Sequence, residues 1–214
     1  MTAILEELIK SPQLPRHFAQ LKDLLAGERK RREQFYDEMT EEGKWEFING
    51  EVIVHSPARY EHTEAAEMLF LLLSIHAARN ELGVVKFEKT LVCLARNDYE
   101  PDICFFTKAK AARFKPDQMK FPAPDFIVEV LSPSTEANDR GVKFEDYAAN
   151  GVREYWLVDP ERQQVEQYVL RTGKYHRHAN LTTGEIASSV IAGFRVPVRA
   201  FFDRAANLAA LQKL

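Results

Sequence analysis

The fold is decided by residues 125–159, which read DFIVEVLSPSTEANDRGVKFEDYAANGVREYWLVD. This stretch predicts a buried strand, a loop, a short helix and a second buried strand. The first strand, residues 126–131, is apolar at nearly every position, as is typical of a sheet covered on both faces, but Glu129 interrupts it. A buried ionised carboxylate is unfavourable unless it is paired, protonated or bound to a cation, so the rest of the chain is expected to supply its partner.

Length and composition indicate a globular protein with a large core. The chain has 214 residues, 45% of them hydrophobic, and a formal net charge of −3, which gives no whole-chain indication of nucleic-acid binding. Cys93 and Cys104 lie in predicted strands without metal-binding spacing, and no secretory leader is recognisable, so a cytoplasmic location is expected. The longest apolar stretch, residues 65–78, is shorter than the about 20 residues of a membrane span, and no membrane partner is expected.

The N-terminal region predicts a loosely attached arm over residues 1–16, which contains two prolines, followed by a helix over residues 17–36. This helix carries a basic run at residues 29–32, RKRR. Such a run is either a solvated helix face or a contact for phosphate or a partner, and the sequence leaves both interpretations open.

A β-hairpin is predicted over residues 45–54, because Asn49-Gly50 supplies the positive φ angles of a type I′ turn between two alternating strands. The two-residue loop fixes the register. The face predicted to point to the core carries Trp45, Phe47, Val52 and Val54. The opposite face carries Glu46 and Glu51, which meet either solvent or a functional site.

The middle of the chain predicts a helix over residues 62–80 and strands over residues 84–94 and 101–106, with Asp102 at the start of the second strand. A charged loop follows at residues 107–121. Its basic side chains, a candidate nucleic-acid surface or a solvated loop, are Lys108, Lys110, Arg113, Lys115 and Lys120.

The C-terminal part predicts a further hairpin around residues 171–173, short strands at residues 186–191 and 194–198, and a helix over residues 200–214. His176 and His178 would share a strand face. With no third ligand nearby, they are interpreted as surface residues and not as a metal site.

A candidate catalytic group emerges from the predicted neighbours of Glu129. If the strands pair side by side, Asp102 and Glu129 converge at one end of the sheet, where two carboxylates either share a proton or hold a cation. Asp139, Lys143 and Tyr147 recur at i, i+4 and i+8, so they line one side of the following helix. Two carboxylates and a lysine suit metal-dependent hydrolysis of a phosphodiester, although a surface Asp-Lys pair also explains the helix.

Several motifs together resemble the Uma-type family of restriction endonucleases, a branch of the PD-(D/E)XK nuclease superfamily. They are EFINGE at residues 46–51, Pro101-Asp102, VEVLSPST at residues 128–135, Asp139 with Lys143 and Tyr147, and GVREYWLVDP at residues 151–160. The resemblance covers roughly residues 35–202. It implies an α/β (α+β) fold with a restriction-endonuclease-like core, in which helices flank a mixed central sheet and extra β-hairpins are added.

The resemblance also implies site residues. Asp102, Glu129 and the backbone carbonyl of Val130 are expected to bind the metal. The superfamily places its lysine two residues after the glutamate, where this chain has Leu131, and Lys143 is expected to supply the amine instead. Further expected residues are Glu46 as an additional acidic group and, behind the metal ligands, His62, Asp139 and Tyr147; His62 could equally be a satisfied histidine at a helix start.

These observations lead to the hypothesis of a Mg²⁺-dependent endonuclease, with Mn²⁺ as a substitute, that acts on DNA as a homodimer. The expected domains are an N-terminal arm and helix at residues 1–36, a nuclease domain at residues 37–203 and its C-terminal helix at residues 204–214. One alternative is a catalytically silent binding module with the nuclease fold. Another is a purely structural Glu129, either neutral or paired with Lys143.

Overall fold

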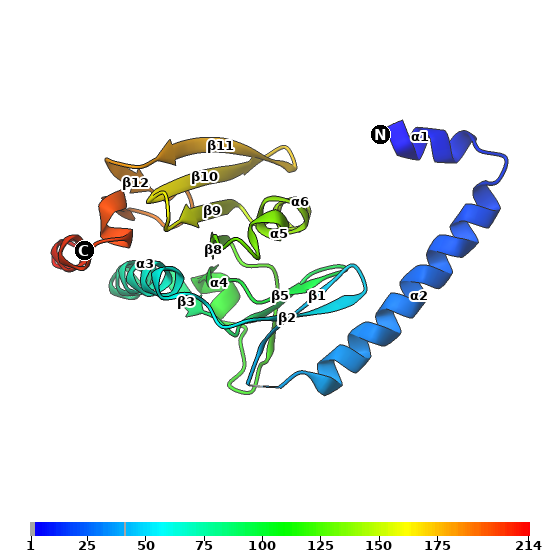
Figure 1. Cartoon of the computed structure of the whole chain (residues 1–214), viewed down its shortest axis with the longest axis horizontal. Helices are drawn as coiled ribbons and strands as arrows, with labels where there is room; N and C mark the ends of the chain where they lie inside the picture. The colour runs from blue at the N-terminus through cyan, green and yellow to red at the C-terminus, as the bar shows by residue number, and fades with distance from the viewer. Residues whose placement is uncertain (1–2, 41) are drawn as a thin grey trace. The chain divides into compact units, whose positions relative to one another are not determined.

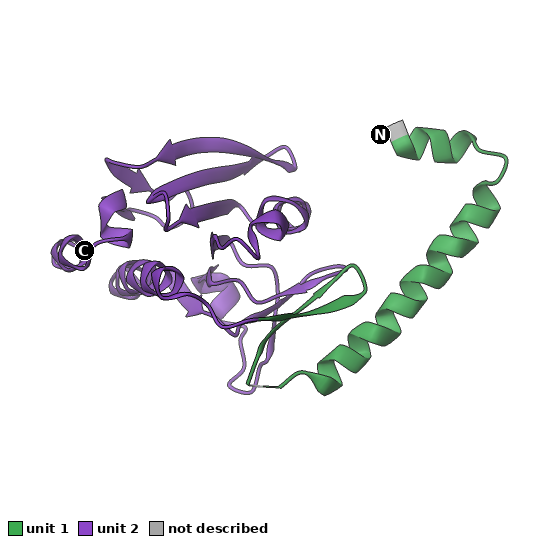
Figure 2. Ribbon diagram, viewed as in Figure 1, with its two compact units in different colours: residues 1–55 green, residues 56–214 purple. Residues whose placement is uncertain are grey.

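The computed structural model describes residues 3–40 and 42–214, so that the first two residues of the predicted arm and residue 41 lie outside the described residues. The chain forms two compact units, residues 1–55 and residues 56–214 (Figure 2). The domain limits expected after residues 36 and 203 remain a prediction. Within the described part of the chain, no helix has the length and apolar character needed to cross a bilayer.

The first unit is two helices followed by a hairpin (Figure 1). Residues of the predicted arm form α1 and the beginning of α2, where Pro15 occupies the first turn. The elements are α1 (Ala3–Lys10), α2 (Leu14–Glu38), β1 (Lys44–Ile48) and β2 (Glu51–His55).

The hairpin has the predicted register, and Asn49 and Gly50 adopt φ angles of 52° and 86°. The predicted core face was wrong for β2, where the side chains of Val52 and Val54 are 43% and 55% exposed. On β1, both Phe47 and the neighbouring Glu46 are fully buried. A strand that is buried on both faces has no single core face that alternation could identify.

The second unit is organised around a six-stranded sheet with the order β11-β10-β9-β8-β6-β3. Strands β8 and β9 are parallel and joined by two short helices, whereas the other neighbours are antiparallel, so the sheet is mixed. This confirms the strand-helix-strand prediction and the mixed sheet flanked by helices. The bounds are α3 (Tyr60–Arg79), β3 (Gly83–Phe87), β6 (Ile103–Thr107), β8 (Phe126–Val130), α5 (Glu136–Arg140), α6 (Val142–Ala149), β9 (Glu154–Asp159), β10 (Gln164–Arg171) and β11 (Lys174–Leu181).

Smaller elements surround this sheet. The strand predicted over residues 84–94 is broken, because Glu88 and Lys89 adopt φ angles of 44° and 34° that no regular strand contains. The predicted charged loop contains a helix and a short strand, and the predicted C-terminal helix begins as a 3₁₀ turn. The bounds are β4 (Leu91–Cys93), β5 (Asp98–Tyr99), α4 (Lys108–Ala111), β7 (Lys120–Phe121), β12 (Glu185–Ala187), β13 (Arg195–Pro197), η1 (Val198–Phe201) and α7 (Arg204–Leu211).

The two faces of β8 are buried for different reasons. Phe126, Val128 and Val130 belong to the main apolar core, together with buried residues of α3, β9 and the C-terminal elements. Alternation along the strand turns Ile127 and Glu129 to the other face. The sheet is therefore covered on both faces, as the apolar sequence of β8 predicts, and Glu129 points away from the main core.

A second buried carboxylate, Glu154 at the start of β9, anchors the segment after β12. Its Oε1 accepts hydrogen bonds from Trp156 Nε1 at 2.7 Å and Gln167 Nε2 at 2.6 Å. Its Oε2 accepts from Ser188 Oγ at 2.7 Å and from the backbone N–H groups of residues 189 and 190 at 2.8 and 2.9 Å. Five donors thus offset the desolvation of one carboxylate, which gives this glutamate a structural role.

Replacing Glu154 with alanine is expected to lower the free energy of unfolding by about 3 kcal/mol or more, because several buried donors would lose their acceptor. Glu185→Ala is the matched control, since Glu185 is exposed and lies 3.8 Å from Arg195 in a surface ion pair, whose loss changes stability by less than about 1 kcal/mol. Urea denaturation measures both variants. Equal stability of the two variants would contradict the structural role of Glu154.

Candidate active site

The carboxylate of Glu129 is held by two side chains of α6. Glu129 is only 1% exposed, and its Oε1 accepts a hydrogen bond from Tyr147 Oη at 2.8 Å and one from Lys143 Nζ at 3.1 Å. Burial raises the pKa of the neighbouring Cys104 thiol, and the negative charge of Glu129 raises it further. The helix that follows β8 therefore supplies the partners that a buried carboxylate in this strand requires.

Lys143 also contacts Asp139 across a break between two helices. The predicted single helix is interrupted at Gly141, which separates α5 from α6, yet Lys143 Nζ lies 3.1 Å from Asp139 Oδ1. This is an ion pair without hydrogen-bond geometry. Burial raises the pKa of the Asp139 carboxyl above its ordinary value and the charge of Asp102 adds to the rise, whereas Lys143 opposes it. The two aspartates are thus close enough to influence each other.

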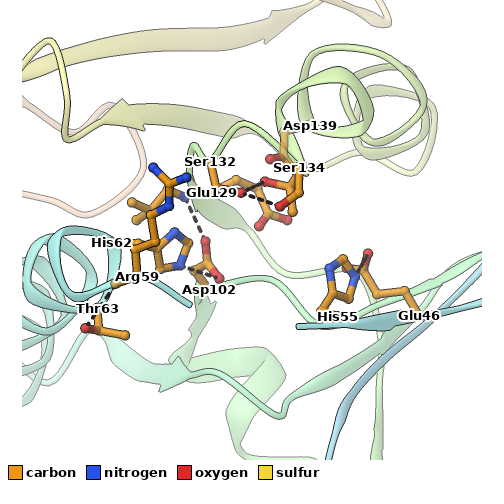
Figure 3. A network of polar contacts seen from close by, with 12 residues as sticks. Glu46, His55, Arg59, His62, Thr63, Asp102, Glu129, Ser132, Ser134 and Asp139 are labelled. Carbon is orange, nitrogen blue, oxygen red and sulfur yellow. Dashed lines mark hydrogen bonds and ion pairs between the residues drawn. The ribbon is translucent and has the colours of Figure 1, made fainter. Parts of the chain in front are cut away.

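Asp102 stands immediately before β6, at the same end of the sheet as Glu129 (Figure 3). Its Oδ2 accepts a hydrogen bond from the backbone N–H of Val130 at 2.8 Å, which ties it to the residue next to Glu129. His62 at the start of α3 places Nε2 3.5 Å from Asp102 Oδ1, and its buried Nδ1 has no hydrogen-bond partner among the described residues. The structure brings together Asp102, Glu129, Lys143 and the three residues expected behind them.

The donors at this end of the sheet are those that a hard divalent cation prefers. Asp102 and Glu129 offer carboxylate oxygens, and Val130 offers a backbone carbonyl. In residues 3–40 and 42–214, no cluster of three or more histidine, cysteine, aspartate or glutamate side chains forms a ready-made metal cage. Two carboxylates still fit Mg²⁺, which keeps several of its waters and commonly binds through one or two protein carboxylates.

Glu46, the additional acidic residue expected from the resemblance, belongs to the first unit. Its side chain is fully buried, and its Oε2 lies 2.8 Å from Nε2 of His55, the last residue of β2, which pairs with Lys44 of β1 (Figure 3). The role of Glu46 in the site remains a prediction. His176 and His178 are both exposed on β11, in keeping with their interpretation as surface residues.

The predicted basic surface begins at the other end of β6 from Asp102. Strand β6 has five residues and spans about 13 Å, and α4 follows its far end. Two of the five basic residues make local contacts: Lys108 Nζ lies 2.9 Å from Glu81 Oε2, and Lys110 Nζ lies 3.2 Å from Asp125 Oδ1. The remaining three, Arg113, Lys115 and Lys120, are exposed.

Sequence reasoning missed two arginines that share a pocket with His62, the residue that contacts Asp102. A small pocket of about 70 Å³ is lined by Arg59, His62, Ser132 and Arg162, among others (Figure 3 labels the first three). The side chains of Arg59 and Arg162 are 72% and 67% exposed. A signal was present for Arg162, because it follows β9, whose carboxyl end lies beside that of the parallel strand β8.

This architecture is a restriction-endonuclease-like nuclease fold. The chain superimposes on the crystal structure of "a putative nuclease belonging to DUF820" from Anabaena variabilis with a TM-score of 0.69, over 84% of this chain and 97% of that one. The two sequences are 17% identical, so this likeness shows the fold alone.

The family follows from the sequence comparison. The model of the Uma2 family, described as "Putative restriction endonuclease", matches residues 32–199, and the chain belongs to this family. A curated relative, the uncharacterized protein slr1290 of Synechocystis, is 28% identical over 130 residues. That match covers 58% of this chain and 65% of the relative, so the chain spans somewhat less than two thirds of the relative's length.

The contact between α4 and Asp125 predicts a pH dependence. Burial acts to raise the pKa of Asp125, but the hydrogen bond from the Thr107 N–H and the charge of Lys110 outweigh it and hold the pKa below its ordinary value. A carboxylate whose folded-state pKa is lowered stabilises the fold above the unfolded-state pKa of about 3.9. This stabilisation is lost as the pH falls through the folded-state pKa. Asp125→Asn should therefore reduce stability most near neutral pH.

The measurement is urea denaturation of wild type and Asp125→Asn between pH 3 and pH 7. The stability difference between them should shrink as the pH falls below about 4. Asp117→Asn, an exposed aspartate of the same segment, is the control and should match wild type. A stability difference between wild type and Asp125→Asn that stays constant from pH 3 to pH 7 would show that the charge of this carboxylate does not stabilise the fold.

Proposed function

We propose that this chain is an endonuclease that hydrolyses phosphodiester bonds in DNA with a divalent cation, Mg²⁺ or Mn²⁺ in its place. Asp102, Glu129 and the carbonyl of Val130 are the proposed ligands. The observation that supports it most is that two buried carboxylates lie at one end of the sheet, one held by the Val130 N–H and the other by Lys143 and Tyr147. Membership of the Uma2 family supports the same reaction class.

Each side chain has a defined role in this proposal. A bound Mg²⁺ would supply charge for the scissile phosphate and lower the pKa of a water. The Val130 N–H and His62 fix Asp102 from two sides, so that its carboxylate is oriented before any ligand arrives. Tyr147 fixes Glu129, and the amine of Lys143 is proposed to orient the attacking water or to stabilise charge that develops on the phosphate.

Lys143 takes the place of the lysine that the superfamily carries on the strand. Leu131, at the corresponding position directly after β8, carries no side-chain amine. Lys143 reaches Glu129 from α6 instead and also lies 5.8 Å from the centre of the Tyr99 ring. Its ammonium is therefore confined by two carboxylates and an aromatic face, which supports a fixed position next to the proposed ligands.

Substrate and assembly are proposals as well. Arg59 and Arg162 are exposed near the carboxylates and would contact phosphates beside the cleaved bond, whereas Arg113, Lys115 and Lys120 would contact DNA further away. A homodimer would provide the two sites that cleavage of both strands requires. The cytoplasmic location expected from the sequence remains a prediction.

The rival is a catalytically silent module, and one observation favours it. The Lys143 ammonium already lies between Glu129 and Asp139, so the network forms ion pairs without any added cation. In that case the three residues would only stabilise the fold, as some buried ion pairs do. Two measurements separate the proposals.

The first measurement is nicking of a supercoiled plasmid with Mg²⁺ or Mn²⁺. Glu129→Gln removes one ligand charge without changing side-chain volume, and the rate should fall about 10²-fold or more. Glu185→Gln, an exposed glutamate with the same change in charge, should retain the wild-type rate. Equal activity of wild type and Glu129→Gln, or no activity of wild type on several DNA forms, would contradict the proposal.

The second measurement is the thermal shift caused by Mn²⁺. An ion that binds only the folded state at a concentration of about 100 times its Kd stabilises it by about 2.7 kcal/mol, so the Tm of wild type should rise and that of Asp102→Asn should not. Lys143→Met should keep the rise but lose nicking, since the amine is not a proposed ligand. A wild-type Tm that is independent of Mn²⁺ would favour the silent module.

A further inference from the structure

The first unit contains a helical arm that precedes the region shared with the family. The family model starts at residue 32, whereas α1 and most of α2 lie before it (Figure 1). This arm carries seven of the thirteen exposed large apolar side chains of the described chain, so it is where an apolar partner surface is concentrated. The seven are Ile4, Leu5, Ile9, Phe18, Leu21, Leu24 and Leu25.

The apolar residues of α2 follow the spacing of a coiled-coil seam. Leu14, Phe18, Leu21 and Leu25 recur at intervals of four, three and four residues, which places them on one stripe of the helix. Phe35 lies on the same line of the helix, beyond the charged positions Glu28 and Arg32, and its ring packs against that of Phe47 in the hairpin with 5.7 Å between the centroids. The hairpin therefore covers the second half of the stripe within the first unit, while Phe18 remains 66% exposed and Leu21 49% exposed in the first half.

We propose that a second copy of this chain covers the exposed half of the stripe, with residues 14–25 of the two copies paired antiparallel. In this register Leu14 faces Leu25 of the partner subunit, and Phe18 faces Leu21 of the partner subunit. The four apolar residues then pair only with one another, as a two-fold interface requires, because the same patch must complement itself.

The charges of the arm favour the antiparallel direction. Parallel helices would set the two basic runs at residues 29–32 side by side, which is repulsive. In the antiparallel register the exposed Glu6 and Glu7 of α1 come next to that basic run of the other copy. At the same end, an open groove of about 560 Å³ between α1 and α2 is lined by Ile4, Glu7, Lys10 and His17, among others.

A second copy fits this stripe better than a lipid surface does. A helix that lies on a membrane has a wide apolar face and cations on its polar face. The apolar face of α2 includes Leu24 beside Leu21 and Leu25, but Glu6 and Glu7 of α1 would be repelled by anionic lipid headgroups.

The test is the molar mass of the full chain by size-exclusion chromatography with light scattering. Wild type should have the mass of a dimer at micromolar concentration. Leu21→Glu should have that of a monomer, because a buried glutamate would face the phenylalanine of the other copy. Gln20→Glu adds the same charge at an exposed position outside the stripe and should remain a dimer. A monomeric wild type, or a dimeric Leu21→Glu, would overturn the proposal.

A second measurement applies if Leu21→Glu fails to fold. Phe18→Cys mixed with Leu21→Cys should form a disulfide-linked dimer on mild oxidation, whereas Gln20→Cys mixed with wild type should not. Absence of the link between the first pair would overturn the proposal. So would a wild type that is monomeric and binds vesicles of phosphatidylglycerol and phosphatidylcholine. These measurements use neither metal nor DNA, so their outcome is independent of the proposed nuclease activity.

Discussion

The contact of Glu129 with Lys143 and Tyr147 is the constraint on which the rest of the second unit depends. Strand β8 is buried on both faces, and an uncompensated carboxylate in its middle would be strongly destabilising. The partners, Lys143 and Tyr147, come from α6. The chain after β8 must therefore return over this face of the sheet before it enters β9. The parallel pairing of β8 and β9 is the geometric consequence of that crossover.

The same constraint gives the site its chemistry. Asp102 reaches this end of the sheet because β6 pairs antiparallel with β8. Its carboxylate accepts a hydrogen bond from the N–H of Val130, the residue that follows Glu129. In the proposed site, Lys143 of α6 would supply the amine, so that the amine and the carboxylates would be positioned by three different elements.

Much of this arrangement could be predicted from the sequence, because local signals and burial agree. One polar residue in an apolar strand identified Glu129, and Asn49-Gly50 fixed the hairpin register. The i, i+4, i+8 spacing grouped Asp139 with Lys143, although the two lie on separate helices, α5 and α6. The buried face of the hairpin could not be predicted, since β1 is covered on both sides. The distance of the basic residues 108–120 from Asp102 and Glu129 could not be predicted either, because it depends on the direction of β6 in the sheet.

The central claim is that the buried carboxylates form a site for a divalent cation and not only a structural ion-pair network. Anomalous X-ray diffraction from crystals soaked in Mn²⁺ tests it most directly, because the ion is located independently of activity. The account predicts an anomalous peak within about 2.0–2.6 Å of carboxylate oxygens of both Asp102 and Glu129. The absence of any peak there at saturating Mn²⁺, with Lys143 still seated between Glu129 and Asp139, would contradict it.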